Sequence, residues 1–543
     1  MKKIPVLIAG AGPVGLTLAI DLAWRGIPSL LIEPLIDVHP HPRAISIGVR
    51  TMEHFRRLGL DQKTIDAGVP RDRALDVIYM DRMLGHEVFR FPIPSINELA
   101  RDAKTLAAGT PEIAASPYYK TWTAQSPLER MLRSHVTTLP AVETRYGWRL
   151  DKFTESADGV VADIVEVATG RRDSIPADYL VGCDGANSVV RNGLGISLAG
   201  RGTLGNASGL YFRAPALDAR LGRRPGVMYW VLAPGIGGVI YTINGGDEWV
   251  FNRYLAPGET ASGEPIALIR RAVGADIAVE LLSAQNWLPR QLVAESYGTQ
   301  RCFLAGDACH LFVPTGGFGM NTGIGDAVDL AWKIQARLAG WGGAHLLASY
   351  EAERRPVGLF NTLEAADNYD KSTSIFAVPE HLEEDGARGD TARAGIAALL
   401  PPKIKHFAPI GVHLGYRYDP SPLVLADGSA APPLEVANYT PTAHPGHRAP
   451  HAWITPERST LDLFGKDFTL LRFGDATGDA LIEAGGKAGL PLTVVDIADP
   501  EIARLYERLL VLVRPDGHVA WRGDSIAADA YQIVDTVRGA MWP

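Results

Sequence analysis

The residues of this chain whose types and spacing could do chemistry begin with a glycine motif near the N-terminus. Gly10 permits a tight turn, Gly12 lets the backbone approach a pyrophosphate, and Gly15 lets a helix pack closely on the preceding strand. Pro13, between them, belongs to the same predicted site. Glu33 can accept hydrogen bonds from the hydroxyl groups of a ribose. Together these residues predict a dinucleotide site.

A strand, a helix and a second strand must position this motif. Residues 4–9 are apolar, residues 16–23 are typical of a helix, and residues 29–32 predict a strand that ends at Glu33. A basic start before apolar residues also resembles a secretory signal, but the glycine spacing and the acid-ended strand favour the nucleotide site. Asp21 and Arg25 interrupt the apolar residues, so no membrane span is predicted.

Two further segments extend the predicted site. Residues 183–188 contain Asp184 followed by a glycine, and residues 305–308 contain Gly306 and Asp307. Each is a modest signal alone, and a plain β-turn is the alternative for the segment at Asp184. In this order and spacing, the three segments describe one FAD site assembled from distant parts of the chain. FAD narrows the chemistry to redox reactions.

The composition limits the class of protein. The chain has 543 residues, enough for roughly two to four domains. Its 46% hydrophobic and 21% charged residues are typical of a globular protein. The formal net charge of −8 and the scattered basic residues argue against nucleic acid or an anionic membrane as a partner. The 3 cysteines form no CxxC pair, which predicts a cytoplasmic protein without a disulfide framework.

The pattern along the chain predicts an α/β fold with three domains. A Rossmann-like FAD-binding domain comprises residues 1–72, 120–200 and 295–375, and an inserted antiparallel-sheet domain for the substrate comprises residues 73–119 and 201–294. Residues 376–543 are predicted to form a linker and a C-terminal domain with strands near 468–473, 492–495 and 509–513.

Some local elements are predicted more closely. A Pro-Gly turn at residues 234–237 joins two strands of the inserted sheet. Ser126 is the predicted N-cap of a helix, with Pro127 in its first turn. Two long helices are expected at about 321–338 and 345–372.

Further motifs are distributed along the chain. They are Pro42-Arg43-Ala44, Gln125 with Glu129, residues 181–191, the run from Gly306 to Lys333, and Tyr-Glu-Ala-Glu-Arg-Arg-Pro-Val at 350–357. With the glycine motif, they make the whole chain resemble the class A flavoprotein aromatic hydroxylases, which are FAD-dependent monooxygenases. The similar subgroup includes phenol hydroxylase and p-hydroxybenzoate hydroxylase, here with a thioredoxin-like C-terminal domain. That domain lacks cysteine in this chain, so a structural role is expected for it.

The resemblance implies roles for individual residues. Asp307 would bind the ribityl hydroxyls, and Arg43 and Gln125 would contact ribityl and phosphate groups. The loop from Gly316 would place backbone N–H groups and a helix end near negative charge on reduced flavin. The implied catalytic residues are Pro314, which would lie against the reacting face of the flavin, and Gly316 in the same loop. The implied cofactor residues are Gly10, Gly12, Pro13, Gly15, Glu33, Arg43, Gln125, Asp184, Gly306, Asp307, Gly317, Gly319, Met320 and Asn321.

The resemblance also implies the reaction. NADH or NADPH would reduce FAD, and O₂ would give a flavin hydroperoxide that hydroxylates a phenolic or similarly activated ring. The chain has one dinucleotide fingerprint, so the nicotinamide would dock transiently on the FAD-binding domain. Some relatives carry an acid or a histidine just after the Arg-Ala pair. This chain has Ile45 and Ser46 there, so the group that deprotonates the substrate is not assigned.

Candidate substrate contacts come from the inserted domain. They are Tyr211, Arg213, Tyr229, Tyr241 and Arg253, with sheet packing as the alternative for Tyr229 and Tyr241. His310 is expected to cap the loop after Asp307. His444, His447 and His451 have a metal-like spacing, but no acidic or cysteine ligand accompanies them, and no metal is predicted.

Two other functions stay open. The same flavin chemistry could serve a bulky natural product or an antibiotic, by epoxidation, Baeyer–Villiger oxidation or inactivating hydroxylation. The chain could also be a non-catalytic flavin-bearing binding protein whose C-terminal domain is the interaction surface. Halogenation is disfavoured because the chain has no Trp-x-Trp-x-Ile-Pro segment. A homodimer is a family expectation.

Overall fold

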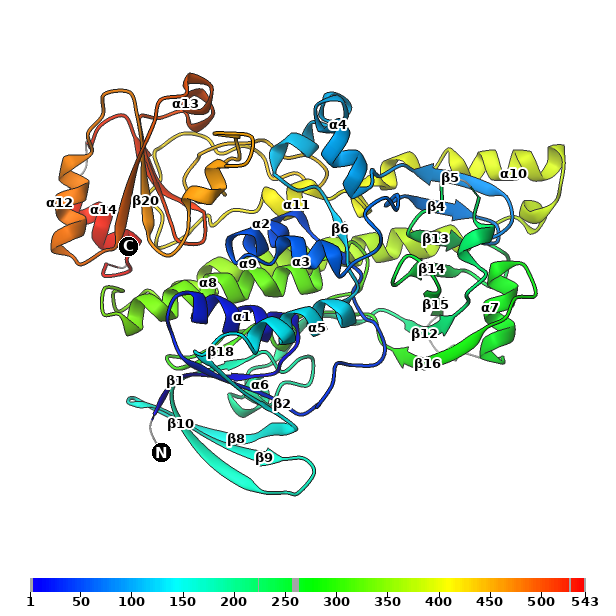
Figure 1. Cartoon of the computed structure of the whole chain (residues 1–543), viewed down its shortest axis with the longest axis horizontal. Coiled ribbons are helices and arrows are strands. Elements are labelled where there is room, and N and C mark those ends of the chain that lie inside the picture. Colours follow the sequence, from blue (N-terminus) through cyan, green and yellow to red (C-terminus); the bar gives the residue numbers. More distant parts are fainter. Residues whose placement is uncertain (1–2, 223, 256–262, 527–528, 542–543) are drawn as a thin grey trace.

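The computed structural model describes residues 3–222, 224–255, 263–526 and 529–541; residues 1–2, part of the secretory-signal alternative, lie outside them. Three units pack together (Figure 1). One contains the N-terminal sheet, one contains a second large sheet beside it, and the third is the C-terminal unit. Helices α8 (Gly319–Leu338) and α9 (Ser349–Thr373) run through the middle of the molecule.

The N-terminal sheet has seven strands in the order β7-β2-β1-β10-β9-β8, with β18 beside β10. Apolar strand β1 (Ile4–Ala9) pairs in parallel with both β2 and β10, and its central residues are buried, as parallel sheets require. The other strands are β2 (Ser29–Glu33), β7 (Val142–Tyr146), β8 (Trp148–Ser156), β9 (Gly159–Glu166), β10 (Arg172–Gly182) and β18 (Cys302–Leu304). This arrangement confirms the Rossmann-like fold class.

Helices cover this sheet and carry the chain between its strands. Helix α1 (Pro13–Trp24) packs against both α5 (Gln125–Val136) and α8. The predicted N-cap of α5 is wrong, because Gln125 already donates its backbone N–H to Ala44 O and the helix starts there. Ser126 is therefore inside the first turn and points its hydroxyl at His39 O. The remaining helices of this unit are α2 (Val49–Arg57), α3 (Asp61–Asp66) and α6 (Val189–Gly193).

The second large sheet also has seven strands, in the order β16-β12-β15-β14-β13-β4-β5. All its neighbours are antiparallel except β13 and β4. The predicted hairpin at 234–237 is confirmed between β13 and β14. The strands are β4 (Val77–Met80), β5 (Glu87–Phe91), β12 (Asn206–Arg213), β13 (Met228–Val231), β14 (Gly238–Thr242), β15 (Glu248–Leu255) and β16 (Glu280–Trp287), and α7 (Pro265–Val273) covers one face.

The segment after α9 belongs structurally to this second sheet. Phe376 and Phe407 pack on the face of the sheet opposite α7, together with residues of α10 (Ala387–Ala397). Figure 1 shows α10 beside β5 at one end of the molecule. The first part of the predicted linker is therefore a packed layer. The domain limits proposed from the sequence stay predictions.

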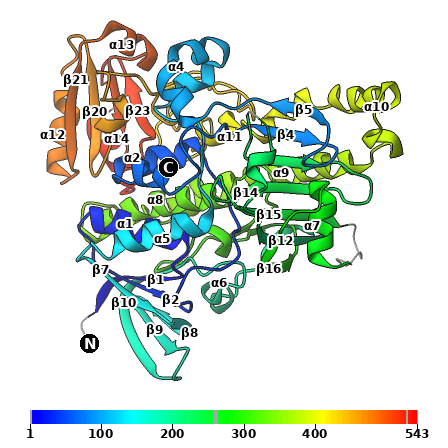
Figure 2. The same ribbon diagram turned by 45° about the vertical axis from the view of Figure 1, so that its right-hand side comes forward.

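Smaller elements join the large sheets. A three-stranded sheet contains β11 (Leu198–Thr203), β17 (Arg290–Ala294) and β19 (His310–Leu311), and β3 (Ser46–Ile47) pairs with β6 (Thr121–Trp122). Helices α4 (Ile96–Gly109) and α11 (Ile410–Leu414) lie between the C-terminal unit and the second sheet (Figure 2).

The C-terminal unit has a four-stranded sheet in the order β21-β20-β22-β23. A strand-helix-strand unit is followed by an antiparallel hairpin and a last helix, which is the thioredoxin-like arrangement. The three predicted strands are present; β23 was not predicted. The elements are β20 (Phe468–Phe473), α12 (Asp479–Lys487), β21 (Leu492–Ile497), α13 (Pro500–Tyr506), β22 (Leu510–Val513), β23 (Val519–Gly523) and α14 (Ala530–Val537).

Buried ion pairs attach the C-terminal unit to the rest of the chain. Arg448 binds Glu53 of α2 through two nitrogens, at 2.5 and 2.9 Å. Arg514 binds Glu353 of α9 at 2.5 and 2.9 Å. All four side chains are buried, so removing one partner would leave an uncompensated charge in the interior. The C-terminal unit is thus an integral part of the packed molecule.

Candidate active site

The first predicted segment forms a tight turn between β1 and α1. Gly10 has a φ of +104°, and a Cβ there would lie 2.3 Å from Cys183 O. A Cβ on Gly15 would lie 1.9 Å from Gly10 O. A Cβ on Gly12 would meet only Glu129 Oε1, at 4.0 Å. Neither Gly10 nor Gly15 tolerates a side chain, whereas Gly12 borders open space at the amino end of α1, where a pyrophosphate fits.

Glu33 lies at the end of β2, beside this turn. Its Oε2 accepts a hydrogen bond from Ala11 N at 2.8 Å, and its Oε1 accepts one from Leu35 N at 3.0 Å. These bonds fix the carboxylate against the glycine turn. Each oxygen keeps a lone pair that could accept from a ribose hydroxyl.

Arg43 and Gln125 border the same space from another side. The Arg43 side chain is exposed, and its Nη2 lies 3.1 Å from His39 Nε2. Gln125 donates from Nε2 to Glu129 Oε1 at 2.6 Å. Burial raises the pKa of Glu129, against the effects of Gln125 and of Arg43. Arg43 therefore lies close enough to act electrostatically on Glu129, the side chain nearest to Gly12.

The second segment crosses directly under the glycine turn. Asp184 Oδ2 accepts from Val189 N at 2.7 Å and from Val190 N at 3.2 Å, so this carboxylate also orders the start of α6. Its Oδ1 is buried and has no hydrogen-bond partner among the described residues. Burial raises the pKa of Asp184, against these hydrogen bonds. Unlike a plain β-turn, the segment thus carries a carboxylate with one buried oxygen that has no hydrogen-bond partner among the described residues.

The third segment is the short turn Gly306–Ala308 after β18. Gly306 has a φ of +65°, and a Cβ there would lie 2.9 Å from Val14 of α1. The Asp307 side chain is reachable by solvent but surrounded by protein atoms. This desolvation raises the pKa of Asp307, against the electrostatic effects of His310 and Arg43. Arg43 thus acts on Asp307 as well as on Glu129. The third segment and the glycine turn next to Glu129 therefore border the same cofactor space.

The glycine loop from Pro314 leads into α8. Gly316 and Gly317 have φ values of +90° and +69°, and Gly317 N donates to Pro314 O at 3.3 Å. Pro314 is exposed, and Met320 packs against the core under the N-terminal sheet. Helix α8 begins at Gly319, after Phe318, whose apolar side chain cannot cap it. Its first N–H groups are therefore available to a negatively charged ligand.

The Asn321 side chain has a different role from the one its position suggested. Its Oδ1 accepts from Gly48 N and Thr51 Oγ1, both at 2.7 Å. Its Nδ2 donates to Gly317 O at 2.7 Å and to Ser46 O at 3.2 Å. The amide thus locks the glycine loop to β3 and α2. A cofactor contact from Asn321 would have to come from its backbone.

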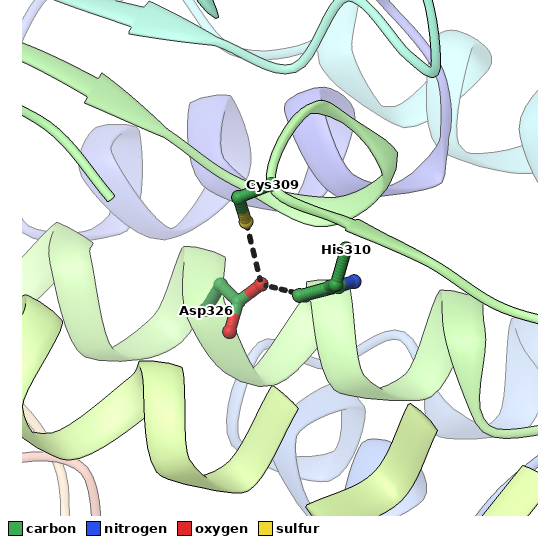
Figure 3. A group of neighbouring side chains, drawn as sticks. All are labelled: Cys309, His310 and Asp326. Carbon is green, nitrogen blue, oxygen red and sulfur yellow. Dashed lines mark hydrogen bonds and ion pairs between the residues drawn. The ribbon is translucent and has the colours of Figure 1, made fainter. Parts of the chain in front are cut away.

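Behind the third segment lies a buried group formed by Cys309, His310 and Asp326 (Figure 3). His310 Nε2 is 2.6 Å from Asp326 Oδ2. His310 therefore contacts a carboxylate of α8 and does not cap the loop after Asp307 as expected. The three side chains could be taken for a metal site. Asp326 Oδ1 also accepts from Arg354 Nε at 2.8 Å, however, and a cation would have to displace this guanidinium.

The second sheet presents one face to these segments. A Cβ on Gly209 of β12 would lie 2.9 Å from His41 Nε2, and Ile45 packs against the apolar residues of this face. We call it the aromatic face, because its core contains Tyr79, Phe91, Trp230, Tyr241 and Phe407, with Phe376 packed against them. Trp230 stacks on Tyr79, with ring centroids 5.4 Å apart, and on Phe376, at 5.8 Å. Trp230 was not among the predicted substrate residues, although it follows Tyr229 in β13 and faces the other side of the sheet.

The predicted substrate residues do not all lie on the aromatic face. Tyr211 does; its ring meets His41 edge-on at 6.2 Å, and its hydroxyl donates to Glu248 at 2.5 Å. Tyr241 is buried in the same face and accepts from Asn252 at 3.2 Å. Tyr229 lies in the core under α7, on the opposite face, which speaks against a substrate contact.

Arg213, Arg253 and the three histidines have other partners. Arg213 is engaged by Glu280 at 2.8 Å and Glu248 at 3.2 Å, and Arg253 lies 3.5 Å from Gly235 O. The three histidines have other contacts. His444 Nδ1 lies 2.9 Å from Pro445 O, and His451 Nδ1 lies 2.7 Å from Ser459 Oγ. The His447 ring lies edge-on to the His444 ring.

Comparisons with known proteins agree with this geometry. Residues 3–362 match the family described as FAD binding domain, and residues 442–540 match the family described as aromatic-ring hydroxylase, C-terminal. The chain is 34% identical to tetracenomycin B2 monooxygenase-dioxygenase of Streptomyces olivaceus, covering 98% of each chain.

Two solved structures are similar over nearly the whole chain. RebC soaked with chromopyrrolic acid and holding 7-carboxy-K252c is 39% identical, with a TM-score of 0.91 and 99% of each chain covered. Aklavinone-11 hydroxylase with FAD and aklavinone is 29% identical, with a TM-score of 0.82 and 99% of each chain covered.

The fold and the converging glycine segments define a flavoprotein monooxygenase. The chain belongs to the FAD-dependent aromatic-ring hydroxylases, as the motifs predicted. Among the residues that the structure describes, no helix has the length and apolar character needed to cross a membrane.

Proposed function

We propose that this protein uses NADH or NADPH and O₂ to hydroxylate a phenolic or similarly activated aromatic compound with several fused rings. The observation that carries the proposal is the aromatic face opposite the flavin segments, with Trp230 stacked between Tyr79 and Phe376. This buried stack forms a rigid wall, and the partly buried rings of Tyr211 and Tyr254 in the same cluster offer stacking surface to a flat substrate.

The relatives support the choice of a large ring system. The names of three similar proteins refer to tetracenomycin, to aklavinone and to 7-carboxy-K252c. We propose that the present chain also acts on a large ring system of this kind. Its substrate would then be a bulky natural product, and its reaction would be hydroxylation of an aromatic ring.

The residues present at the site fit FAD. Gly12 leaves room for the pyrophosphate, Glu33 is held for the ribose, and Asp307 is reachable for the ribityl hydroxyls. When bound, FAD supplies the activation of O₂ that hydroxylation needs. The amino end of α8 and the N–H groups around Gly316 and Gly317 would stabilise negative charge beside Pro314.

The protein's own groups would orient the substrate and exclude water. The aromatic face and Ile45 are apolar, and a dry site protects oxygen transfer from side reactions. Tyr211 lies against the loop that carries Arg43, and its hydroxyl is held by Glu248, so we propose it as a substrate contact. The nicotinamide would dock transiently on the FAD-binding domain, close to Asp184. The three unpaired cysteines fit a cytoplasmic protein, and a homodimer remains a family expectation.

The test is NADH and NADPH oxidation by the purified yellow protein against simple phenols, hydroxybenzoates, hydroxypyridines and polycyclic phenols. Product mass and H₂O₂ are followed together. We expect polycyclic phenols to accelerate oxidation and to gain one oxygen atom. Acceleration with H₂O₂ alone would mark a poorly fitting effector. Oxidation that no ring accelerates, with FAD bound, would contradict the proposal and favour a non-catalytic binding protein.

A further inference from the structure

Asp326 connects three separate parts of the flavin region. It lies in α8 and is completely buried, and three residues contact its carboxylate. Gly306 N donates to Oδ2 at 3.2 Å, His310 Nε2 lies 2.6 Å from Oδ2, and Arg354 Nε donates to Oδ1 at 2.8 Å. Figure 3 shows Asp326 pointing from its helix toward Cys309 and His310.

The turn that carries Asp307 has little freedom next to this carboxylate. A Cβ on Gly323 of α8 would lie 2.8 Å from Gly306 Cα, and a Cβ on Gly306 would lie 2.9 Å from Val14 of α1. The turn is therefore wedged between the two helices whose amino ends face the cofactor space. The hydrogen bond from Gly306 N to Asp326 fixes the position of Gly306, and therefore of Asp307, along the axis of α8.

Arg354 extends the same network to the C-terminal unit. Its Nη2 donates to Thr322 O at 3.0 Å, and its Nη1 lies 3.3 Å from the Tyr418 hydroxyl. Tyr418 is held on the other side by Arg514, 4.9 Å from its ring centroid, and by the His518 ring, at 4.3 Å. Arg514 and His518 belong to the turn between β22 and β23. A chain of contacts thus runs from the cysteine-free unit to the flavin segment.

The charges in this network are matched. Burial alone would raise the pKa of Asp326, but His310 and Arg354 hold it below its usual range. The carboxylate forms a buried ion pair with Arg354, at 2.8 Å between Oδ1 and Nε, and so compensates the guanidinium. Replacing the carboxylate by an amide would keep its size but would leave that guanidinium without its partner.

We propose that Asp326 is a positioning residue that fixes the Asp307 turn against α8, and that the C-terminal unit holds Asp326 through Tyr418 and Arg354. The proposal gives the thioredoxin-like unit a part in cofactor binding without any redox chemistry of its own. It rests on the proposed contact between Asp307 and FAD, and it is independent of the substrate.

The full-length protein with Asp326→Asn tests the first part. We expect the dissociation constant of FAD, titrated into the apoprotein, to rise about ten-fold or more, since a hydrogen bond to a charged group is lost. The visible spectrum of the flavin that still binds should change, because the isoalloxazine sits differently. His310→Gln removes the neighbouring contact more gently and serves if the first variant does not fold. An unchanged dissociation constant and spectrum in the folded variants would overturn the proposal.

Tyr418→Phe tests the second part, since it removes one hydroxyl at a distance from the flavin. We expect FAD affinity to fall about two- to five-fold, with a non-additive effect when Tyr418→Phe and His310→Gln are combined. Tyr506→Phe is the matched control, because that buried hydroxyl donates to Pro450 O inside the C-terminal unit. Asp462→Asn is a second control; it removes the negative charge and one acceptor oxygen from the ion pair with Arg56, which is 2.6 Å long and also lies between the units. Equal effects of Tyr418→Phe and the two controls would show that only general docking matters.

Discussion

The two halves of the candidate site are built by different means. The flavin half depends on backbone geometry: glycines with no room for a side chain, and helix ends whose N–H groups face outward. The substrate half depends on side-chain packing between strands of the second sheet and the segment after α9. Backbone requirements restrict a position to one residue type, whereas an apolar face accepts many aromatic or aliphatic residues. The flavin half should therefore fail abruptly on mutation, and the substrate half gradually.

The largest effect is expected for Gly15→Ala. Its Cβ would lie 1.9 Å from Gly10 O, which is backbone and cannot move aside cheaply. We expect a loss of about 3 kcal/mol or more in the free energy of unfolding, with most FAD lost. Thermal denaturation and the flavin content of the purified protein measure this.

Gly486→Ala is the control for that experiment. Gly486 lies in α12, and its Cβ would meet nothing within 4 Å. This variant should be as stable as the wild type or gain about 0.5–1 kcal/mol. Equal stability of the two variants would contradict the difference drawn between the halves.

Gly12→Ala separates cofactor binding from folding. The added Cβ would meet only Glu129 Oε1, at 4.0 Å, so the apoprotein accepts it. It projects into the space assigned to the pyrophosphate, and we expect FAD affinity to fall about ten-fold or more, while the stability of the apoprotein falls by no more than about 1 kcal/mol, since Gly12 is the N-cap of α1. Titration of the apoprotein with FAD and its thermal denaturation distinguish the two. Unchanged affinity would remove Gly12 from the proposed site.

A smaller effect is expected in the substrate half. Trp230→Phe keeps a ring between Tyr79 and Phe376 but makes it smaller, so the wall against which the substrate packs is less well supported. The KM for the accepted aromatic substrate should rise about two- to ten-fold, with FAD affinity unchanged. Tyr229→Phe changes the residue just before Trp230 in β13, on the opposite face of the sheet, and should leave KM unchanged. A larger effect from Tyr229 would mean that the substrate uses the other face.

The last effect concerns His41, which lies between the halves; near neutral pH it is the smallest, because it develops only in acid. Burial, with His39 and Arg43, lowers the pKa of His41 to about 4, from an ordinary value of 6.5. The unfolded chain binds the extra proton first as the pH falls, so this group removes stability between pH 6.5 and 4. His41→Gln should reduce the number of protons taken up on unfolding by up to one over this window. Tm should therefore fall less steeply between pH 6.5 and 4 than in the wild type. An unchanged slope would mean that the imidazole is solvated in the folded state.

Sequence reasoning succeeded where a residue's type had a local physical cause. The strands at β1, β2 and β20 and the hairpin at 234–237 follow from apolar runs and turn residues, and the structure confirms them. The glycine segments could be assigned to one cofactor because a turn without side chains has few other uses. The N-cap at Ser126 was wrong because a long-range hydrogen bond from Gln125 to Ala44 started the helix earlier.

The side-chain roles were harder to predict, because they depend on what the fold brings near. His310 was expected to cap a loop, but Asp326 comes within 2.6 Å of it from a different element. Asn321 turned out to lock the glycine loop to β3 and α2 through four hydrogen bonds. Tyr229 and Tyr241 were indistinguishable as sequence, since a β-strand alternates faces and the buried partner of each face is unknown.

The sequence by itself determined the fold class, the family and the cofactor, because glycine turns, acid-ended strands and helix starts are local features that the backbone enforces. Only the tertiary structure decided which face of the second sheet meets the flavin segments, that the segment after α9 closes that face, and that Asp326 ties Gly306 to Arg354. These contacts join residues far apart in the chain. Their existence depends on packing and on the pairing of buried charges, which a one-dimensional pattern does not record.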